Sequence, residues 1–229
     1  MKRINGSVVT APIGGQEIRF FVANERDAIQ KHHAAGEFYE AEEIAIIARH
    51  FPAGAHYVDI GANVGNHAVY AAKFLAPASV VVIEPNPPAI EILRLNLLLN
   101  DLASRVDASL LGFGLAEAEG MARAVVPPNN LGGSGLVLDA AGATIPLRRG
   151  DDLLAGRRID FIKLDVEGME LGVLAGLEGL IATWRPRMFI EVHNRNAAPF
   201  RQWLARLGYG VRDTFRRYPS NENFMVVPE

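Results

Sequence analysis

The stretch YVDIGANVGNHAVYAA, residues 57–72, decides the fold. A short apolar run ends near Asp59, a Gly-x-Asn-x-Gly turn follows at residues 61–65, and a helix-like segment begins at about Asn66. The two glycines permit a sharp turn and a close approach of the backbone to a ligand, where a Cβ atom would collide. A strand, a glycine turn and a helix in this order favour an α/β domain with a ligand at the turn.

Further strands and helices alternate along the rest of the chain. Apolar strand-like runs occur at residues 79–84, 105–112, 159–165 and 187–193, and helix-like segments at residues 66–76, 87–100, 169–184 and 199–208. Strands that alternate with helices predict βαβ crossovers and therefore a mostly parallel sheet. The last two strands, at residues 209–215 and 223–228, have no helix between them, which predicts an antiparallel strand at one edge.

The N-terminal region and one long internal segment stand apart from this alternation. Two β-favouring runs around Gly14 and Gly15 predict a hairpin, and apolar residues at helical spacing predict a helix at residues 37–50. Residues 112–159 are too many for one loop, so we expect a small β insertion and then a helix that starts at Asp151. We therefore divide the chain into an N-terminal β-hairpin extension, residues 1–36, and one domain, residues 37–229.

Composition excludes several classes of protein. The chain has 229 residues, 49% of them hydrophobic and 21% charged, with a net charge of −3. This charge argues against non-specific nucleic-acid binding. The absence of cysteine removes disulfides, thiolate nucleophiles and zinc–thiolate sites. No apolar run approaches the roughly 20 residues that span a bilayer, and the first residues lack the apolar core of a signal peptide. We expect a cytoplasmic protein without a membrane or nucleic-acid partner.

The predicted strands end in acidic residues. In an open parallel sheet, ligands bind outside the carboxyl ends of the strands. Carboxylates stand at four of these five ends, which are Asp59 with the turn 61–65, Glu84 with Pro85 and Asn86, Leu111 with Gly112, Asp165 with Glu167, and Glu191 with His193. This pattern predicts a ligand site at that edge of the sheet.

The turn and its flanking acids indicate which ligand. A dinucleotide site has Gly-x-Gly-x-x-Gly and places a pyrophosphate on the helix N-terminus. Here Asp59 precedes the turn, and its carboxylate would repel a pyrophosphate but suit a positive amino group. Glu84, at the end of the next strand, suits the two ribose hydroxyls. An adenosine that carries an amino acid satisfies both, which predicts S-adenosyl-L-methionine as the cofactor.

Four motifs make the chain resemble a known family. VDIGANVGNHA, VIEPNP, FIKLDVEGMELGVLAG and PRMFIEVHN are similar, in order and spacing, to the motifs of the FkbM-type S-adenosylmethionine-dependent methyltransferases. The resemblance covers roughly residues 37–227. It implies a Rossmann-like class I methyltransferase fold with a seven-stranded sheet and one antiparallel strand. It also implies O-methylation of a hydroxyl on a sugar or secondary metabolite.

Candidate cofactor residues follow from the strand ends and this resemblance. They are Asp59, Gly61, Ala62, Asn63, Gly65, Asn66, Glu84, Pro85, Asn86 and Asp165. Many related enzymes read the adenine amine with a polar residue after the third strand. This chain has Leu111, Gly112 and Phe113 there, which leaves the adenine contact open.

The predicted reaction is an in-line displacement in which a hydroxyl oxygen attacks the sulfonium methyl group. Because an alcohol is a poor nucleophile at neutral pH, a base is needed, and His193 is the first candidate. Asp165 would orient the hydroxyl, and Glu167 and Glu191 complete the predicted catalytic set. These four side chains could instead bind magnesium, but no metal-loop spacing supports that, so we expect no metal.

Several alternatives remain open at the sequence level. The glycine turn could be purely structural, Asp165 could be a helix cap, and NNLGGSG (residues 129–135) could be a plain loop or a substrate lid. We expect His32 and His33 to be solvated. A nicotinamide-dependent oxidoreductase and a non-catalytic cofactor-binding module share the expected fold. The hydroxylated small-molecule acceptor and the oligomeric state cannot be read from the sequence.

Overall fold

The computed structural model describes residues 4–138 and 141–229, so the predicted extension 1–36 begins outside it. Its central sheet has seven strands, in the spatial order β12 (Tyr209–Phe215), β13 (Asn221–Pro228), β11 (Arg187–His193), β10 (Phe161–Leu164), β3 (His56–Ile60), β4 (Ser79–Ile83) and β5 (Val106–Asp107). Strands β11, β10, β3, β4 and β5 are mutually parallel. The antiparallel strand is β13, one position in from the edge, because β12 pairs outside it and forms the edge itself.

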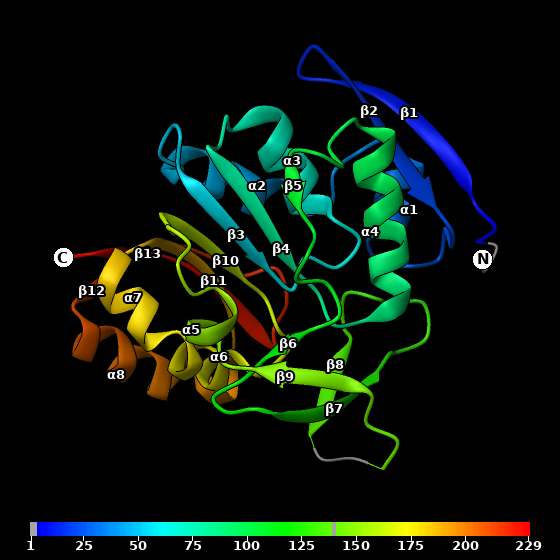
Figure 1. Ribbon diagram of the computed structural model, residues 1–229. Coiled ribbons are helices and arrows are strands. Elements are labelled where there is room, and N and C mark those ends of the chain that lie inside the picture. Colours follow the sequence, from blue (N-terminus) through cyan, green and yellow to red (C-terminus); the bar gives the residue numbers. More distant parts are fainter. Residues whose placement is uncertain (1–3, 139–140) are drawn as a thin grey trace.

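Helices cover both faces of this sheet (Figure 1). One face carries α2 (Ala41–His50), α3 (Asn66–Phe74) and α4 (Pro87–Leu99), and the other carries α5 (Gly150–Leu153), α6 (Glu170–Gly176), α7 (Glu178–Trp184) and α8 (Ala197–Leu207). A short 3-10 helix, η1 (Asn194–Asn196), precedes α8. The segment predicted as one helix at residues 169–184 is two helices, α6 and α7, that break at Leu177.

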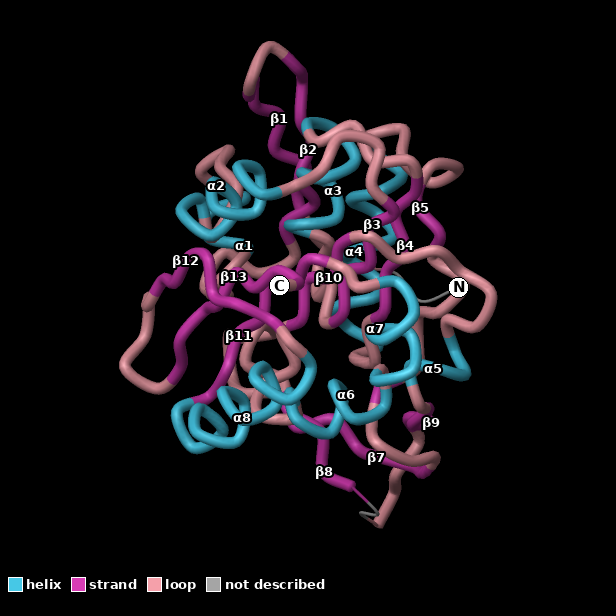
Figure 2. The backbone as a smooth tube through the Cα atoms, turned by 90° about the vertical axis from the view of Figure 1, so that its left-hand side faces the viewer, coloured by secondary structure: helices cyan, strands magenta, loops and turns pink. Residues whose placement is uncertain are grey.

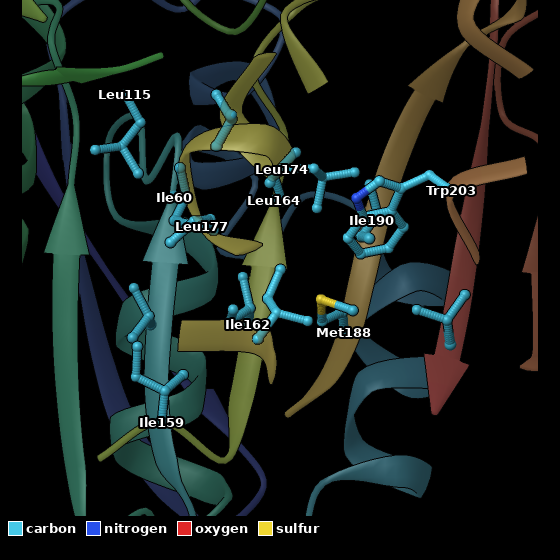
Figure 3. Packing of buried hydrophobic residues seen from close by; sticks show 14 of the residues in the cluster. Ile60, Leu115, Ile159, Ile162, Leu164, Leu174, Leu177, Met188, Ile190 and Trp203 are labelled. Carbon is cyan, nitrogen blue, oxygen red and sulfur yellow. The ribbon is translucent and has the colours of Figure 1, made fainter. Parts of the chain in front are cut away.

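The buried strands supply a core on each face of the sheet. Side chains alternate along β3, so that Tyr57 packs with α2 to α4 while Val58 and Ile60 pack with α5 to α8. Figure 3 shows Ile162 of β10 and Ile190 of β11 in the core between the sheet and helices α5 to α8. Because both faces are covered, these strands are mostly apolar, as parallel strands usually are, and Asp59 in β3 and Lys163 in β10 are buried charged exceptions.

The N-terminal hairpin is docked on α4. It consists of β1 (Ser7–Ile13) and β2 (Gln16–Val22), and α1 (Gln30–Ala34) follows. The side-chain oxygens of Asn96 on α4 and of Asn100, the residue after it, accept hydrogen bonds from the backbone N–H groups of Phe21 and Arg19. These bonds satisfy the free edge of β2. The predicted domain boundary at residue 37 stays a prediction.

The predicted insertion is a second, four-stranded sheet. Its spatial order is β6 (Gly114–Leu115), β9 (Ile145–Arg148), β7 (Gly120–Val125) and β8 (Gly135–Leu138). In Figure 2, β7 and β8 lie at the opposite end of the molecule from the hairpin β1–β2. Within the described ranges, no helix is both long enough and apolar enough to cross a membrane.

Candidate functional site

A cavity of about 320 Å³ opens at the carboxyl ends of the central strands. Its floor is the ends of β3, β4, β10 and β11, as the position of ligands in open parallel sheets predicts. Three other parts of the chain complete the walls: residues 28–40 before α2, residues 130–136 of the insertion, and residues 218–221 between β12 and β13. The site therefore depends on elements outside the strand–helix repeat.

The glycine turn connects β3 to α3 in a left-handed conformation. The φ angles are 77° at Gly61, 48° at Asn63 and 86° at Gly65. A Cβ atom at Gly61 would lie 1.8 Å from the carbonyl oxygen of Asp165, so only glycine fits there. The absent side chain at Gly61 thus lets the β3 turn pack against the end of β10, a packing role that the sequence did not reveal.

Glu84 ties the end of β4 to this turn. Its two carboxylate oxygens accept hydrogen bonds from the backbone N–H groups of Asn63, at 2.7 Å, and Asn86, at 2.8 Å. The Glu84 residue is 5% exposed, and burial raises its pKa to about 7 in spite of the two backbone hydrogen bonds. Each oxygen keeps a free lone pair, so the carboxylate can still accept from a ligand hydroxyl.

A buried charge pair lies directly below the cavity. Asp59 in β3 is 0% exposed, and its Oδ1 lies 3.7 Å from Nζ of Lys163, its register partner in β10. The Lys163 ammonium also donates to the backbone oxygen of Gly61 and to Oδ2 of Asp165. Burial alone would lower the pKa of Lys163, but the carboxylates of Asp165 and Asp59 raise it above its usual value. Lys163 therefore stays charged and is fully engaged.

Three carboxylates converge at the ends of β10 and β11. Asp165, Glu167 and Glu191 each offer one oxygen within 4.8 Å of the others. Burial, followed by repulsion from Asp165, raises the pKa of both glutamates, and that of Glu191 reaches about 10. The Glu167 residue as a whole is exposed, but its carboxyl group lies at the cavity mouth beside those of Asp165 and Glu191. Its left-handed φ of 49° costs about 1–2 kcal/mol for a side-chain-bearing residue.

A fourth carboxylate, Glu40, reaches the cavity from the start of α2. Its backbone is also left-handed, with a φ of 61°. Its Oε2 lies 3.6 Å from Nε2 of His67 in the first turn of α3. Burial, then repulsion from Asp165, raises the pKa of Glu40 to about 8. The His67 side chain is 7% exposed, and burial lowers its pKa well below the usual value, so the imidazole is neutral.

Asn66 fixes the backbone that presents Glu40. Its side-chain oxygen accepts from the N–H of Tyr39, and its side-chain amide donates to the carbonyl of the same residue. The same oxygen is 3.1 Å from Nε2 of His33. Our expectation that His33 is solvated is wrong: the ring is 0% exposed and stacks on Phe20, with 4.3 Å between ring centroids.

The loop NNLGGSG forms a roof over the glycine turn. Asn63 Nδ2 donates to the carbonyl oxygen of Leu131, and Asn86 Nδ2 donates to Oγ of Ser134. The Leu131 N–H in turn donates to Oδ2 of buried Asp27 in the N-terminal segment. The roof is therefore tied both to the predicted cofactor residues and to the extension.

Most of the predicted site residues meet around this cavity. Those that line it are Gly61, Ala62, Asn63, Asn66, Glu84, Pro85, Asp165, Glu167 and Glu191. Asp59, Gly65, Asn86 and His193 lie outside the lining. The His193 ring faces its own 3-10 helix, where Nδ1 accepts from the N–H of Arg195. Leu111, Gly112 and Phe113 are also outside the lining, whereas Gly114 and Leu115 belong to it.

Sequence reasoning missed Glu40, His67 and Lys163, which all line the cavity. One signal was present for Lys163, because a lysine inside the apolar strand FIKL needs a buried partner. Glu40 had no distinctive signal, since it is one of four acids in EFYEAEE and only its backbone conformation separates it from the others.

The lining offers polar atoms that the protein itself does not use. Asn63 Oδ1, His67 Nε2, Asp165 Oδ1 and Asn221 Oδ1 are buried and form no hydrogen bond with the described part of the chain. Buried polar groups are normally paired, so these atoms indicate a polar ligand. Together with Glu84, the oxygens of Asn63 and Asp165 suit the hydroxyl and amino groups of an amino-acid-bearing nucleoside.

Fold and site define a class, the Rossmann-like enzymes that hold a nucleoside cofactor across the carboxyl edge of the sheet. The family model of the methyltransferase FkbM domain matches residues 59–211, which is more than half of the chain. The chain therefore belongs to the FkbM methyltransferase family.

Individual relatives agree with this assignment. Methyltransferase sdnD of Sordaria araneosa is 29% identical over 179 residues, which cover 59% of this chain and 68% of sdnD. Hexuronic acid methyltransferase AglP of Haloferax volcanii is 26% identical over 199 residues, 82% of this chain and 75% of AglP. The solved structure of TrmK from M. capricolum with the cofactor product S-adenosyl-homocysteine has a TM-score of 0.54 and 10% identity, and the match covers 84% of this chain and 69% of that one.

These findings confirm the predicted family and the Rossmann-like fold. The chain is a methyltransferase, and membership of this family implies S-adenosyl-L-methionine as its cofactor. The roles of individual residues stay predictions.

Proposed function

We propose that this protein is an S-adenosylmethionine-dependent O-methyltransferase that acts on a hydroxyl of a small molecule, a sugar or a secondary metabolite, in the cytoplasm. The observation that carries the proposal is the arrangement of the cavity, in which Glu84 lies at one end and Asp165, Glu167 and Glu191 at the other. One end suits a ribose and the other suits the loss of a proton from a hydroxyl. The relatives sdnD and AglP, both methyltransferases, support the class of reaction.

The cofactor would be held by the turn 61–65 and by Glu84. The Glu84 carboxylate has free lone pairs for ribose hydroxyls, and the unpaired oxygens of Asn63 and Asp165 can accept from an amino group. When bound, the cofactor supplies a methyl group on a positively charged sulfur. The carboxylate of Asp165, fixed by Lys163, favours positive charge at this point of the cavity.

Proton removal from the acceptor falls to a group at the other end of the cavity. Glu167 lies at the mouth, and its raised pKa makes it a stronger base than an ordinary carboxylate. His193, the base that the sequence favoured, does not line this cavity, so Glu167 takes that role in our proposal.

Calorimetry with S-adenosylhomocysteine, run beside NADH, tests the cofactor half of the proposal. We expect a micromolar dissociation constant, about −8 kcal/mol, for the first compound and no binding of NADH. Glu84→Gln should weaken S-adenosylhomocysteine about ten- to a hundredfold, as for hydrogen bonds to a charged group. Glutamine is preferred to alanine because one side-chain oxygen can still accept from Asn63 or Asn86 and preserve the turn.

Transfer of labelled methyl groups from S-adenosylmethionine to a panel of hydroxylated compounds tests the other half. Label in an acid- and base-stable methyl ether supports O-methylation of a hydroxyl. Label in an N-methyl group or in a base-labile ester, or tight binding of NADH with no affinity for S-adenosylhomocysteine, contradicts the proposal.

A further inference from the structure

The order of the strands divides the cavity into two halves. Glu84 stands at the end of β4, whereas Asp165 and Glu191 stand at the ends of β10 and β11, with β3 between them. If Glu84 holds the ribose, the cofactor lies over β3 and β4 and its amino-acid part extends toward β10. The half over β10 and β11 is then left for the acceptor.

This acceptor half is lined by more carboxyl groups than the nearby cations can pair with. We call Glu40, Asp165, Glu167 and Glu191 the acid cluster. Among the described lining residues, Lys163 is the one lysine or arginine, and Asp59, Asp165 and the Gly61 carbonyl already engage it. The sulfonium and the amino group of the cofactor, offset by its own carboxylate, add one net positive charge. Several carboxylates of the cluster therefore keep no cationic partner from the protein or the cofactor.

A second observation, independent of charge, also indicates a donor-rich ligand. The His67 imidazole is buried and neutral, and its Nε2 has no hydrogen-bond partner in residues 4–138 and 141–229. Its nearest acidic neighbour, Oε2 of Glu40, is 3.6 Å away, which is too far for a hydrogen bond. A buried ring nitrogen next to a carboxylate suits a ligand group with several N–H or O–H donors.

The backbone is built to hold this arrangement. Glu40 adopts a left-handed conformation that is unfavourable for glutamate, and the paired hydrogen bonds between Asn66 and Tyr39 fix the preceding residue. Unfavourable backbone conformations that the surroundings enforce are concentrated at ligand sites. The side chain of Glu40 is therefore fixed toward the cavity.

We propose that the acceptor carries a protonated amine close to its methylated hydroxyl, and that Glu40, Glu191 and His67 receive this amine. The inference rests on the proposed function, because it assumes that the cofactor fills the other half of the cavity. An ammonium group has three N–H donors and one positive charge, which match two carboxylates and one imidazole nitrogen. An acceptor with a carboxylate or phosphate would instead meet these carboxyl groups and find no lysine or arginine free to pair with it in the described part of the lining.

The protonation of these carboxyl groups agrees with this assignment. Burial and mutual repulsion raise the pKa of Glu40 to about 8 and that of Glu191 to about 10, so both carboxyl groups retain protons at neutral pH. A bound cation would favour their ionised forms. Binding of an amine should therefore release protons to the buffer.

Amino sugars, each paired with its N-acetyl derivative, test the inference on the protein saturated with S-adenosylhomocysteine. The amine should be placed at different ring carbons, and glucuronate serves as the anionic probe. Calorimetry in buffers of different ionisation enthalpy measures both affinity and proton release. We expect at least one amine to bind about tenfold or more tightly than its N-acetyl partner, with proton release, and glucuronate to bind more weakly than glucose.

Matched variants test which side chains produce the preference for the amine. Glu40→Gln and Glu191→Gln should each reduce the preference for the amine about tenfold and leave the affinity for S-adenosylhomocysteine within about twofold. Glu37→Gln is the control, because Glu37 is an exposed acid three residues before Glu40 and lies outside the cavity lining. It should keep the full preference.

Three outcomes overturn the inference: no amine that binds more tightly than its N-acetyl partner, a preference that survives in both variants, or binding that requires added magnesium and disappears with chelator. The last would assign the acid cluster to a metal ion. If S-adenosylhomocysteine binds normally in any of these cases, only the acceptor inference fails. If it does not bind, the proposed function fails first.

Discussion

At the scale of single residues, Asp59 and Lys163 organise the charges of the site. Both side chains are buried, in neighbouring strands at the same register position. A buried ion pair contributes little net stability, but removal of one partner costs about 3–5 kcal/mol. Lys163 also contacts Asp165, so the pair below the sheet edge fixes a carboxylate that faces the cavity. This connection explains a charged residue in the apolar strand FIKL.

Glu167 and His193 give a direct test at this scale. Glu167→Gln should lower kcat about 10²- to 10⁴-fold, the usual contribution of a general base, because the amide cannot accept the hydroxyl proton. Affinity for S-adenosylhomocysteine should stay within about twofold. The pH–rate profile of the wild type should fall toward acid as Glu167 takes up a proton, and the variant should lose this limb.

His193→Gln is the matched comparison for Glu167→Gln. It should turn over at close to the wild-type rate, since its ring lies outside the cavity lining and accepts from the backbone of Arg195. A large loss in His193→Gln together with an active Glu167→Gln would return the base to the histidine.

At the scale of elements, two asparagines do the same structural task in different places. Asn66 on α3 binds the backbone of Tyr39 beside the cavity, and Asn100, the residue after α4, binds the backbone of Arg19 in the hairpin. Each side chain forms hydrogen bonds with both the N–H and the C=O group of one backbone residue. Substitution of each asparagine in turn therefore distinguishes a loss of stability from a change at the functional site.

Asn66→Ala and Asn100→Ala should each lower the free energy of unfolding by about 2–3 kcal/mol, because each leaves backbone groups unpaired. Denaturation in urea measures this loss. Below the unfolding transition, only Asn66→Ala should reduce kcat/KM for the acceptor, since Tyr39 determines where Glu40 points. Equal activity of the two variants would show that Asn66 has only a structural role.

Element boundaries also show what the sequence could and could not predict. Alternation predicted the parallel strands and the helices well, because both faces of the sheet are covered. It could not predict the break at Leu177, since the apolar period continues through it. At this point Gly176 packs closely against the insertion, where a Cβ atom would lie 2.3 Å from the carbonyl oxygen of Ala116, and such a tertiary contact cannot be read from the apolar period.

At the scale of the whole molecule, the residues at the strand ends could be predicted from the sequence, but those that form the walls of the cavity could not. The carboxyl-end rule placed Glu84, Asp165 and Glu191 at one edge from the sequence alone. The rest of the cavity comes from the N-terminal segment, the insertion and the turn before β13, which meet only in the folded chain. Tyr39 and Tyr218, whose hydroxyls are 2.8 Å apart, illustrate such a contact between distant segments.

The same assembly concentrates acids in the interior, which makes the stability of the ligand-free protein depend on pH. Burial raises the pKa of Asp59 to about 6, that of Glu84 to about 7, that of Glu40 to about 8 and that of Glu191 to about 10. A carboxyl group with a raised pKa stabilises the fold while it is protonated, and this contribution is lost as pH rises through the folded-state value. Buried His33, with a pKa lowered to about 4, has the opposite effect and destabilises the fold below about pH 6.5.

The four carboxyl groups outweigh the histidine above the ordinary carboxyl pKa of about 4, so we expect the ligand-free protein to lose stability as the pH rises from about 5 to 9. Each carboxyl group that is protonated in the folded protein and ionised in the unfolded chain lowers the free energy of unfolding by about 1.4 kcal/mol per pH unit. Glu191→Gln should raise the midpoint of thermal unfolding at pH 9 and leave it nearly unchanged at pH 5.5, where the wild-type carboxyl is already protonated. Asp165, Glu167 and Glu40 repel the ionised form of Glu191, and Lys163 offsets only part of this repulsion. Two results would contradict this: a midpoint that rises from pH 6.5 to 9, or a Glu191→Gln variant less stable than wild type at pH 9. Either would mean that folding does not raise the pKa values of the acid cluster.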